Sequence, residues 1–278
     1  MVVNQLDHER ANFEETINQA RNLFGKKVTV LQYPVNQGPG FNSVVDILSM
    51  KMYKYPVGGK LEIVEIPDSE KAKAEELRNI LCENAAESEE SLMEKFFDKG
   101  ELSNEEIIEG LKKGIISKSL SPVLCVSAKN NTGVSLLLDF IKEVIPSPGE
   151  MPMAKDINGN EIKCDSKEEP SLMIFKTLIE QHVGEISFFK VYSGEITEAI
   201  DMINTRNFSK ERLSQLFVTL GKNRTKIEKL VAGDIGCTIK LKDCSTNDTL
   251  VTKNTSLRIK PIEFPSPRYR IAIVNKNA

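Results

Sequence analysis

The chain has 278 residues, a length that predicts about two domains. Hydrophobic residues make up 40% and charged residues 28%, which excludes collagen-like, mucin-like and wholly disordered proteins. No apolar run approaches the roughly 20 residues that span a bilayer, and no signal peptide pattern is visible, so we expect a cytoplasmic protein without a membrane partner. The formal net charge of −3 does not favour a free nucleic-acid-binding protein, which is usually strongly basic.

The cysteines and histidines give no pattern of a metal site. The five cysteines contain no C-x-x-C pair, and His8 and His182 lie far apart in the sequence. Structural zinc needs Cys and His ligands at short spacings, so we assign no metal site and expect reduced thiols. Cys125, inside an apolar run, is expected to be a small core residue.

The first half of the chain predicts alternating strands and helices. Residues 2–3 predict the end of a strand, and a helix then ends at Gly25. A long helical region follows, where Asp68 and Ser69 are candidates for capping the first helix, and where Ser103 and Glu106 form a capping box at a later one. Further strands are expected at 28–35, in three runs within 43–66 with a turn at 56–59, and at 122–126. Helices are expected within 68–113 and at 133–145. The buried side of the first helix within 68–113 is expected to carry Ala72, Leu77, Ile80 and Leu81.

The second half of the chain predicts an antiparallel β-domain. Pro148 and Pro152, flanked by Pro146 and Pro170, and a turn at Asn158 and Gly159 indicate a linker at about 147–167. Strand-like runs separated by turns follow at 171–179, 184–192, 213–219 and 235–241. We therefore place a β-barrel at 168–258 and interpret 259–278 as the start of a further, missing domain.

Two polar loops that follow strands carry candidate chemistry. The first contains Asn4, Gln5, Leu6 and Asp7, and the second Ser127, Ala128 and Lys129. A carboxylate such as Asp7 can accept the two N–H groups that guanine offers and adenine does not. The amide of Asn4 can tie the loops together, and the Ala128 N–H can donate to the guanine carbonyl. By themselves, both loops are equally explained as ordinary polar turns.

Residues along nearly the whole chain resemble bacterial translation elongation factor G. The similar stretches in the first half are 3–13, 41–47, 83–87, 91–95, 122–129 and 146–148, and those in the second half are 175–176, 183–184, 187–194, 211–213, 232–235 and 248–250. They occur in the order of that family. This resemblance is much more specific than either loop alone.

The resemblance implies a multidomain fold. Residues 1–146 would be the C-terminal part of an α/β P-loop-GTPase domain, with an α+β subdomain inserted at about 26–120. Residues 168–258 would be the second domain, an antiparallel Greek-key β-barrel. The implied function is GTP-driven translocation of tRNA and mRNA on the ribosome, with GTP or GDP and Mg²⁺ as ligands of the full-length protein. We expect a monomer.

Several residues depart from the family pattern. The sequence contains no G-x-x-x-x-G-K-[ST] phosphate loop, so we expect a fragment that is inactive alone and binds nucleotide poorly. Gln5 replaces the lysine of the family's N-K-x-D loop, and Asn247 replaces a glycine, where it is expected to adopt a left-handed conformation. Two alternatives stay open: a ribosomal protection protein of the tetracycline-resistance type, and a ribosome-binding paralogue that has lost GTP dependence.

Three further groups of residues are candidates for partner contacts or for structure. Residues 83–109 hold ten acidic residues and two lysines, which indicates either a solvated face or, from the resemblance, a contact for the ribosomal stalk protein through Glu90 and Glu94. Four basic residues, Lys222, Arg224, Lys226 and Lys229, indicate an ordinary basic face or contact with small-subunit rRNA. Phe188, Phe189 and Tyr192 are expected to pack in the barrel, and His182 is given no role.

Overall fold

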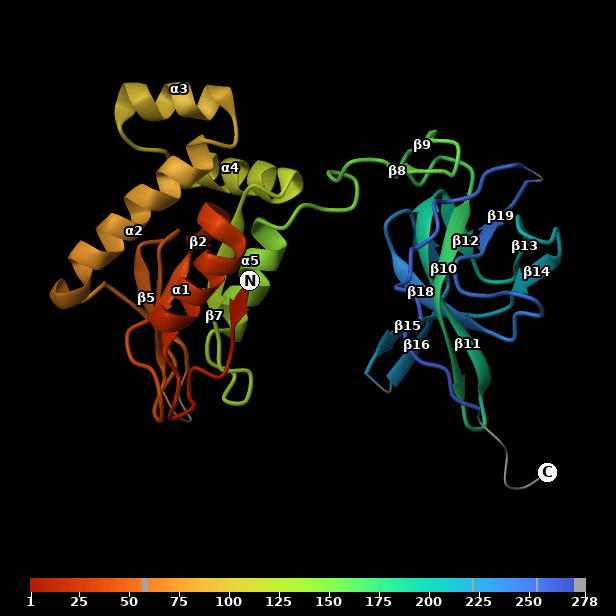
Figure 1. Cartoon of the computed structure of the whole chain (residues 1–278), viewed down its shortest axis with the longest axis horizontal. Helices are drawn as coiled ribbons and strands as arrows, with labels where there is room; N and C mark the ends of the chain where they lie inside the picture. The colour runs from red at the N-terminus through yellow and green to blue at the C-terminus, as the bar shows by residue number, and fades with distance from the viewer. Residues whose placement is uncertain (57–59, 222, 254, 273–278) are drawn as a thin grey trace. The chain divides into compact units, whose positions relative to one another are not determined.

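A computed structural model of the chain describes residues 1–56, 60–221, 223–253 and 255–272 (Figure 1). The polypeptide divides into two compact units, Met1–Ser147 and Pro148–Ala278. Most of the turn expected at 56–59 lies outside the described residues, as does Lys222. Within the described residues, no helix has the length and apolar character needed to cross a membrane.

A parallel sheet lies at the centre of the first unit. Its strands are β1 (Val2–Val3), β7 (Ser121–Cys125) and β2 (Val28–Val30), in the order β1-β7-β2. The sheet shares one hydrophobic core with helices α1 (Phe13–Phe24) and α5 (Val134–Glu143). Such burial explains why β2 and β7 are nearly continuous apolar runs in the sequence.

An antiparallel sheet follows β2 directly. Its strands are β3 (Gln32–Pro34), β4 (Ser43–Asp46), β5 (Lys51–Lys54) and β6 (Glu62–Val64), paired in chain order. The single strand expected at 28–35 is therefore two strands in two sheets. Leu31 separates them: its N–H donates to Val123 of the parallel sheet, and its carbonyl accepts from Ile47 beyond β4.

Three helices connect β6 to β7. They are α2 (Asp68–Ala86), α3 (Glu90–Lys99) and α4 (Asn104–Ser117). The expected cap by Asp68 and Ser69 is wrong, because Pro67 occupies the N-cap position and no side chain caps the helix. The buried side of α2 is formed by Ala74, Leu81, Cys82, Ala85 and Ala86, so that Leu81 is predicted correctly and Ala72, which is exposed, is not. The capping box of Ser103 and Glu106 is confirmed.

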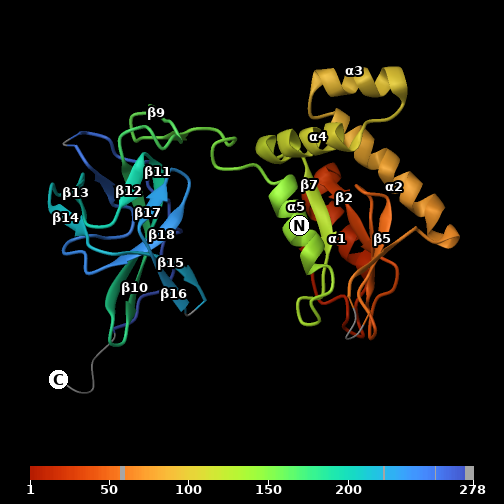
Figure 2. The ribbon, with the colours of Figure 1, turned by 180° about the vertical axis from the view of Figure 1, so that it is seen from behind.

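An eight-stranded antiparallel sheet forms most of the second unit (Figure 2). Its order is β14-β13-β19-β10-β11-β18-β15-β16. These strands are β10 (Ser171–Glu180), β11 (Gly184–Ser193), β13 (Ile200–Asn204), β14 (Lys210–Leu213), β15 (Leu216–Leu220), β16 (Asn223–Ile227), β18 (Ile235–Ile239) and β19 (Thr249–Val251). A separate pair joins β12 (Glu195–Thr197) to β17 (Lys229–Val231).

The eight-stranded sheet curls into a half-barrel around its own core. The pairing of β10 with β11 shifts between Ser171 and Leu172 and again between Ile174 and Lys176. Such bulges increase the local twist of a sheet and let it bend. The core that the curl encloses contains Leu172, Ile174, Phe189, Val191, Ile196, Met202, Leu213, Leu216, Leu230 and Leu250. Within the described residues, the ladder ends at β14 and β16.

Part of the expected linker is folded into the second unit. Strands β8 (Ala154–Lys155) and β9 (Glu161–Ile162) form a hairpin, and Asp156 accepts hydrogen bonds from the backbones of Asn158 and Asn160. Ile162 packs with Met173 and Ile259 in a second small core. Part of the segment that its composition predicted to be a linker therefore packs against the second unit through Ile162.

Asn247 lies in a left-handed turn just before β19, with φ of 78°, as expected from the sequence. Its side chain makes two hydrogen bonds to one residue of the following segment. The amide nitrogen donates to the Ile262 carbonyl at 3.1 Å, and the amide oxygen accepts the Ile262 N–H at 2.9 Å. The side chain thus pairs with backbone as a neighbouring strand would.

Candidate functional site

The two loops singled out in the sequence meet at one edge of the parallel sheet. Val2 pairs with Leu124 and Val3 with Cys125, so strands β1 and β7 end at the same level. The Val126 N–H then donates to the Val3 carbonyl at 2.9 Å. Because parallel strands present their carboxyl ends at the same edge, loops that follow them are adjacent.

Asn4 connects the two loops directly. Its side-chain oxygen accepts the N–H of Gln5 at 2.8 Å and the N–H of Ala128 at 3.0 Å. The predicted tie between the loops is therefore present. The Ala128 N–H, expected to be offered to a base carbonyl, is already bonded inside the protein.

Asp7 lies opposite Ser127 across the two loops. A hydrogen bond from the Ser127 hydroxyl is the main cause that holds the pKa of the Asp7 carboxyl below its ordinary value, with Lys129 and His8 adding smaller contributions. Ser127 is itself buried, and its backbone exchanges two hydrogen bonds with Thr132. A carboxylate has about four acceptor positions, so Asp7 keeps acceptor capacity for a ligand.

An open pocket of about 420 Å³ lies over these loops. It is lined by Asn4, Gln5, Asp7, His8 and Lys129. Gln5 is exposed and has a positive φ of 62°, a left-handed backbone conformation that is uncommon for residues other than glycine. The volume lies within the range of small-molecule sites. His8 is the lining residue that the sequence analysis did not select, and its position next to Asp7 was the only available signal.

The first loop and the helix after it are held by Gly38 and Gln37, two residues that the sequence analysis did not select. Leu6 is buried, and its carbonyl accepts the N–H of Gly38 at 2.7 Å. Gln37 accepts the N–H of Phe13 at 2.7 Å and so holds the start of α1. The second loop is held by Gly133, where an added Cβ would lie 2.2 Å from the Cys125 carbonyl oxygen.

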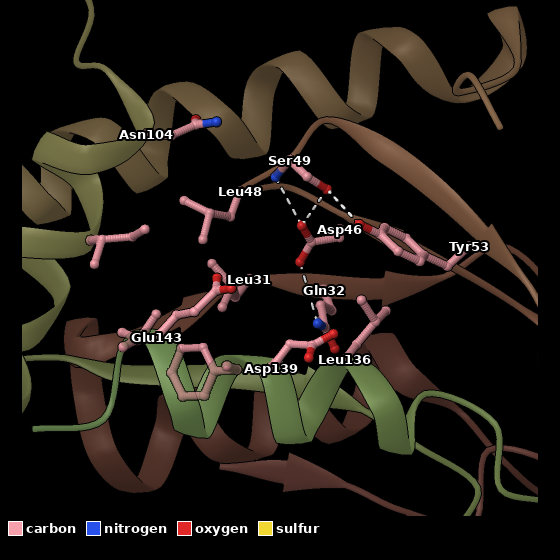
Figure 3. Close-up of a pocket in the computed structure, with 13 residues that line it drawn as sticks. Leu31, Gln32, Asp46, Leu48, Ser49, Tyr53, Asn104, Leu136, Asp139 and Glu143 are labelled. Atoms are coloured by element: carbon pink, nitrogen blue, oxygen red, sulfur yellow. Dashed lines mark hydrogen bonds between the residues drawn. The ribbon is translucent and has the colours of Figure 1, made fainter. Parts of the chain in front are cut away.

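A second pocket of about 230 Å³ lies elsewhere in the first unit, between α5 and strands β3 to β5 (Figure 3). Gln32 and Asp46 line it, and the Gln32 amide donates to Asp46 at 3.3 Å while Ser49 donates to Asp46 twice. The carboxylates of Asp139 and Glu143 face the same space. In the described part of the chain, no group of three or more potential ligands is arranged to hold a metal ion. The buried polar groups here connect strands.

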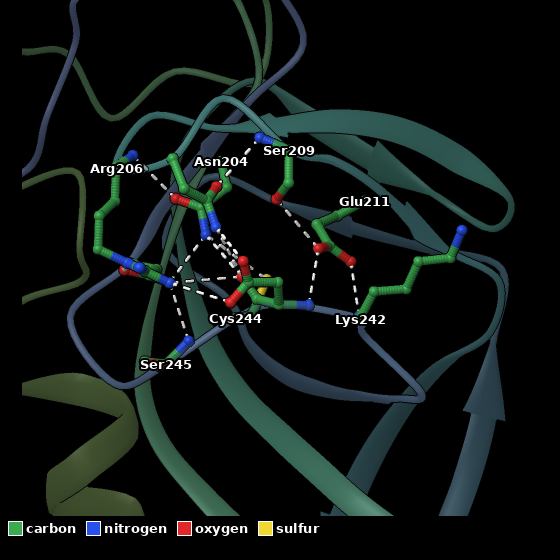
Figure 4. Close-up of polar contacts among 10 residues, drawn as sticks. Asn204, Arg206, Ser209, Glu211, Lys242, Cys244 and Ser245 are labelled. Atoms are coloured by element: carbon green, nitrogen blue, oxygen red, sulfur yellow. Dashed lines mark hydrogen bonds and ion pairs between the residues drawn. The ribbon is translucent and has the colours of Figure 1, made fainter.

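A polar network in the second unit fixes the segment before β19 (Figure 4). Asp248 accepts from Arg206 at 2.7 Å and from Asn204 at 2.8 Å. Burial alone would raise the pKa of Asp248, but these donors lower it overall. Glu211, also buried, accepts the backbone N–H groups of Lys242 and Asp243. The network is structural, because each carboxylate is occupied by this chain's own donors.

The three described members of the basic group selected in the second unit are held in ion pairs. Arg224 pairs with Glu180, Lys226 with Glu198 at 2.6 Å, and Lys229 with Glu195 at 3.0 Å; Lys222 lies outside the described residues. These pairs reduce the positive charge that this face offers to RNA phosphates.

The aromatic residues of β11 pack as expected. Phe189 is fully buried in the core of the sheet, and Phe188 packs against Phe175 with ring centroids 6.5 Å apart. Tyr192 is half-buried beside the small core around Met173. His182, in the turn after β10, is exposed with a positive φ of 70°. None of these observations indicates a base-stacking surface on β11.

The acidic helices α3 and α4 divide into paired and unpaired carboxylates. Glu106 pairs with Lys95, and Glu89 and Glu109 both pair with Lys113. Glu90 and Glu94 are exposed on α3. The charge open to a partner is therefore concentrated on α3.

Comparison with known proteins shows that part of the chain is similar to a known domain family. Residues 169–253 match the family model described as elongation factor G domain 2. A crystal structure of a protein from Thermus thermophilus is similar with a TM-score of 0.79 and 22% sequence identity, over 96% of this chain and 38% of that one. This identity shows a shared fold, and the chain spans little more than a third of the structure that it matches. The half-barrel thus belongs to the segment that is similar to domain 2 of elongation factor G.

Proposed function

We propose that the chain is part of an elongation factor G-like translational GTPase, whose full-length form promotes movement of tRNA and mRNA on the ribosome. The observation that carries this proposal is the match of residues 169–253 to elongation factor G domain 2. It is supported by the parallel strand pair of the first unit, which brings Asn4 and Asp7 next to Ser127 and Ala128. We interpret the first unit as the C-terminal part of a GTPase domain with an inserted subdomain.

The pocket over β1 and β7 would hold the guanine base of GTP or GDP. Asp7, oriented by Ser127, would accept the ring N–H and the exocyclic amine. Asn4 would have to release the Ala128 N–H for the base carbonyl, which costs a hydrogen bond. Gln5 offers an uncharged stem where the family has lysine. The sequence has no phosphate loop to hold Mg²⁺ and the phosphates, so we expect GDP to bind this chain more weakly than micromolar.

A second candidate is a ribosome-binding relative that does not use GTP. Gln5 and the internally bonded Ala128 N–H favour it, because both reduce what the pocket offers to guanine. Both candidates require ribosome binding, and they differ in the base preference of the pocket.

The test of the shared proposal is co-sedimentation of the 278-residue chain with purified 70S ribosomes. We expect saturable binding that excess elongation factor G, held in its GTP form by a non-hydrolysable analogue, displaces. A globular protein of the same net charge is the control. Absence of saturable binding at low salt would reject a ribosomal function. NMR titration with guanosine and with adenosine then separates the candidates: guanine-selective shifts at Asp7 favour the GTPase, and equal responses favour the relative without GTP.

A further inference from the structure

The C-terminal end of α1 carries a group of basic residues without ion pairs. Arg21 and Lys26 are exposed, and Lys27 is half-buried in the 3₁₀ turn η1 (Gly25–Lys27) that follows the helix. Within the described residues, none of the three makes a salt bridge. Arg224, Lys226 and Lys229 of the second unit, in contrast, are each held by a glutamate. Arg21, Lys26 and Lys27 are therefore free to meet an external anion, unlike these three basic residues of the second unit.

A pocket of about 390 Å³ lies beside these residues. Its lining consists of Arg21, Gly25, Lys26, Val28, Ile80 and Asn84. No acidic side chain is found among these described lining residues. Val28 and Ile80 contribute apolar surface to this lining, and Arg21 and Lys26 contribute positive charge. A ligand that fits must combine negative charge with a flat or apolar part.

An exposed aromatic ring lies beside Lys27, the residue that follows Lys26 of this pocket in the sequence. Phe24 is 49% exposed although it ends an amphipathic helix, and the Lys27 ammonium lies 5.8 Å from its ring centroid. Leu23, its neighbour, is 77% exposed. Single-stranded nucleic acid is bound in this way, with cations along the phosphates and a base stacked on an aromatic face. An acidic peptide would use the cations but has no comparable need for the ring.

We propose that this region contacts single-stranded RNA, with the basic side chains on phosphates and Phe24 stacked on a base. The residues concerned, here named the basic end of α1, are Arg21, Phe24, Lys26 and Lys27. The inference deepens the proposed function, on which it rests for the choice of ribosomal RNA as the partner. It places an RNA contact in the first unit. Acidic residues outnumber basic residues in the first unit, so we expect attraction of RNA to these cations only at short distance and a strong dependence of its affinity on salt.

The direct test is fluorescence anisotropy of the whole chain with a fluorescein-labelled 12-nucleotide oligo(U) RNA. Three phosphate contacts predict a slope of log affinity against log salt of about −2, or roughly twenty-fold weaker binding at 200 mM than at 50 mM salt. The triple variant Arg21→Glu, Lys26→Glu, Lys27→Glu is expected to lose at least about ten-fold at 50 mM salt. Phe24→Leu, which keeps the apolar volume, is expected to lose about five-fold from lost stacking.

The matched control carries the same change of charge at paired positions of the first unit: Lys71→Glu, Lys73→Glu, Lys95→Glu. Circular dichroism melts verify that both triple variants are folded. Equal loss in the two variants would mean that bulk charge alone binds RNA, and no binding by the wild-type chain at 50 mM salt would also overturn the proposal. So would tighter binding of a labelled oligoglutamate peptide that depends on the same residues.

Ribosome co-sedimentation separates this inference from the function it rests on. If the chain binds oligo(U) with the predicted variant pattern but does not sediment with ribosomes, the RNA contact stands and the ribosomal function fails. If it sediments with ribosomes and the α1 triple variant does so equally well, the ribosomal function stands and the basic end of α1 is not its RNA contact.

Discussion

The side-chain oxygen of Asn4 accepts the backbone N–H of Ala128 at 3.0 Å, although the two residues are 124 positions apart in the chain. This bond exists because β1 and β7 are parallel and end at the same level. The whole antiparallel sheet and helices α2 to α4 lie between the two loops in sequence. The pocket over the loops therefore forms only when the first unit is folded.

Asn4→Ala should destabilise the chain and loosen the second loop. The substitution leaves the Gln5 and Ala128 N–H groups without their acceptor, and we expect a loss of about 1 kcal/mol because water replaces part of the bond. Urea denaturation measures the free energy of unfolding. Asn18→Ala, at an exposed position of α1, is the matched control and should change it little. An equal effect of both variants would show that the Asn4 bond contributes nothing.

Ser127→Ala should raise the pKa of Asp7 toward its ordinary value of 3.8, since the Ser127 hydroxyl is the main cause that lowers it. A lowered pKa in the folded state means that the ionised carboxylate adds stability above pH 3.8, and that this contribution is lost as the pH falls through the folded pKa. The stability difference attributable to Asp7 should therefore shrink below about pH 4. An NMR titration of the Asp7 carboxyl carbon checks the shift, and an unchanged pKa would contradict the assigned bond.

Gly133→Ala should destabilise the first unit by at least about 2 kcal/mol, through left-handed strain and a backbone clash. Gly133 has φ of 76°, and an added Cβ would lie 2.2 Å from the Cys125 carbonyl oxygen. Gly100→Ala is the control, because Gly100 lies in the same unit and has a similar φ of 75° with no atom within 4 Å of the added Cβ. It should cost only about 1 kcal/mol. Thermal melts that show equal losses would refute the close approach.

Reversing two charges on α3, with Glu90→Lys and Glu94→Lys, should weaken binding to the ribosomal stalk protein at low salt by about ten-fold or more. The reason is that both carboxylates are exposed, whereas Glu106 and Glu109 are held by lysines. Surface plasmon resonance with purified stalk protein measures the change. Glu75→Lys with Glu76→Lys on α2 makes the same change in net charge at other exposed positions and should have a smaller effect. Unchanged affinity in the α3 variant would reject the contact.

Several local signals in the sequence predicted local structure correctly, although the cap expected from Asp68 and Ser69 did not form. The capping box of Ser103 and Glu106 and the left-handed Asn247 are confirmed, because each depends on a few neighbouring atoms. Cys125 is buried as expected from its apolar run. The expected tie of the two loops by Asn4 is confirmed, and whether they bind guanine stays a prediction.

Long-range pairing decided the features that the sequence analysis missed. The split of 28–35 into two strands depends on Leu31 bonding to both Val123 and Ile47, which no local pattern encodes. The occupation of the Ala128 N–H by Asn4 and the ion pair of Arg224 with Glu180 likewise depend on contacts between distant segments. Residue types alone identified the candidate binding groups, but they could not show which of these groups already have hydrogen-bond or ion-pair partners within the chain.

The paired hydrogen bonds of Asn247 with Ile262 have a consequence for how the chain leaves the half-barrel. A glycine at position 247 would adopt the same turn with less strain, but it would offer no side chain to the backbone that follows. Asparagine at position 247 adopts the strained left-handed conformation, and its side chain fixes the segment at Ile262 to the turn through two hydrogen bonds. The direction in which residues 263–272 continue is therefore coupled to the turn before β19. Slow exchange of the Ile262 amide hydrogen with solvent would show that these hydrogen bonds persist.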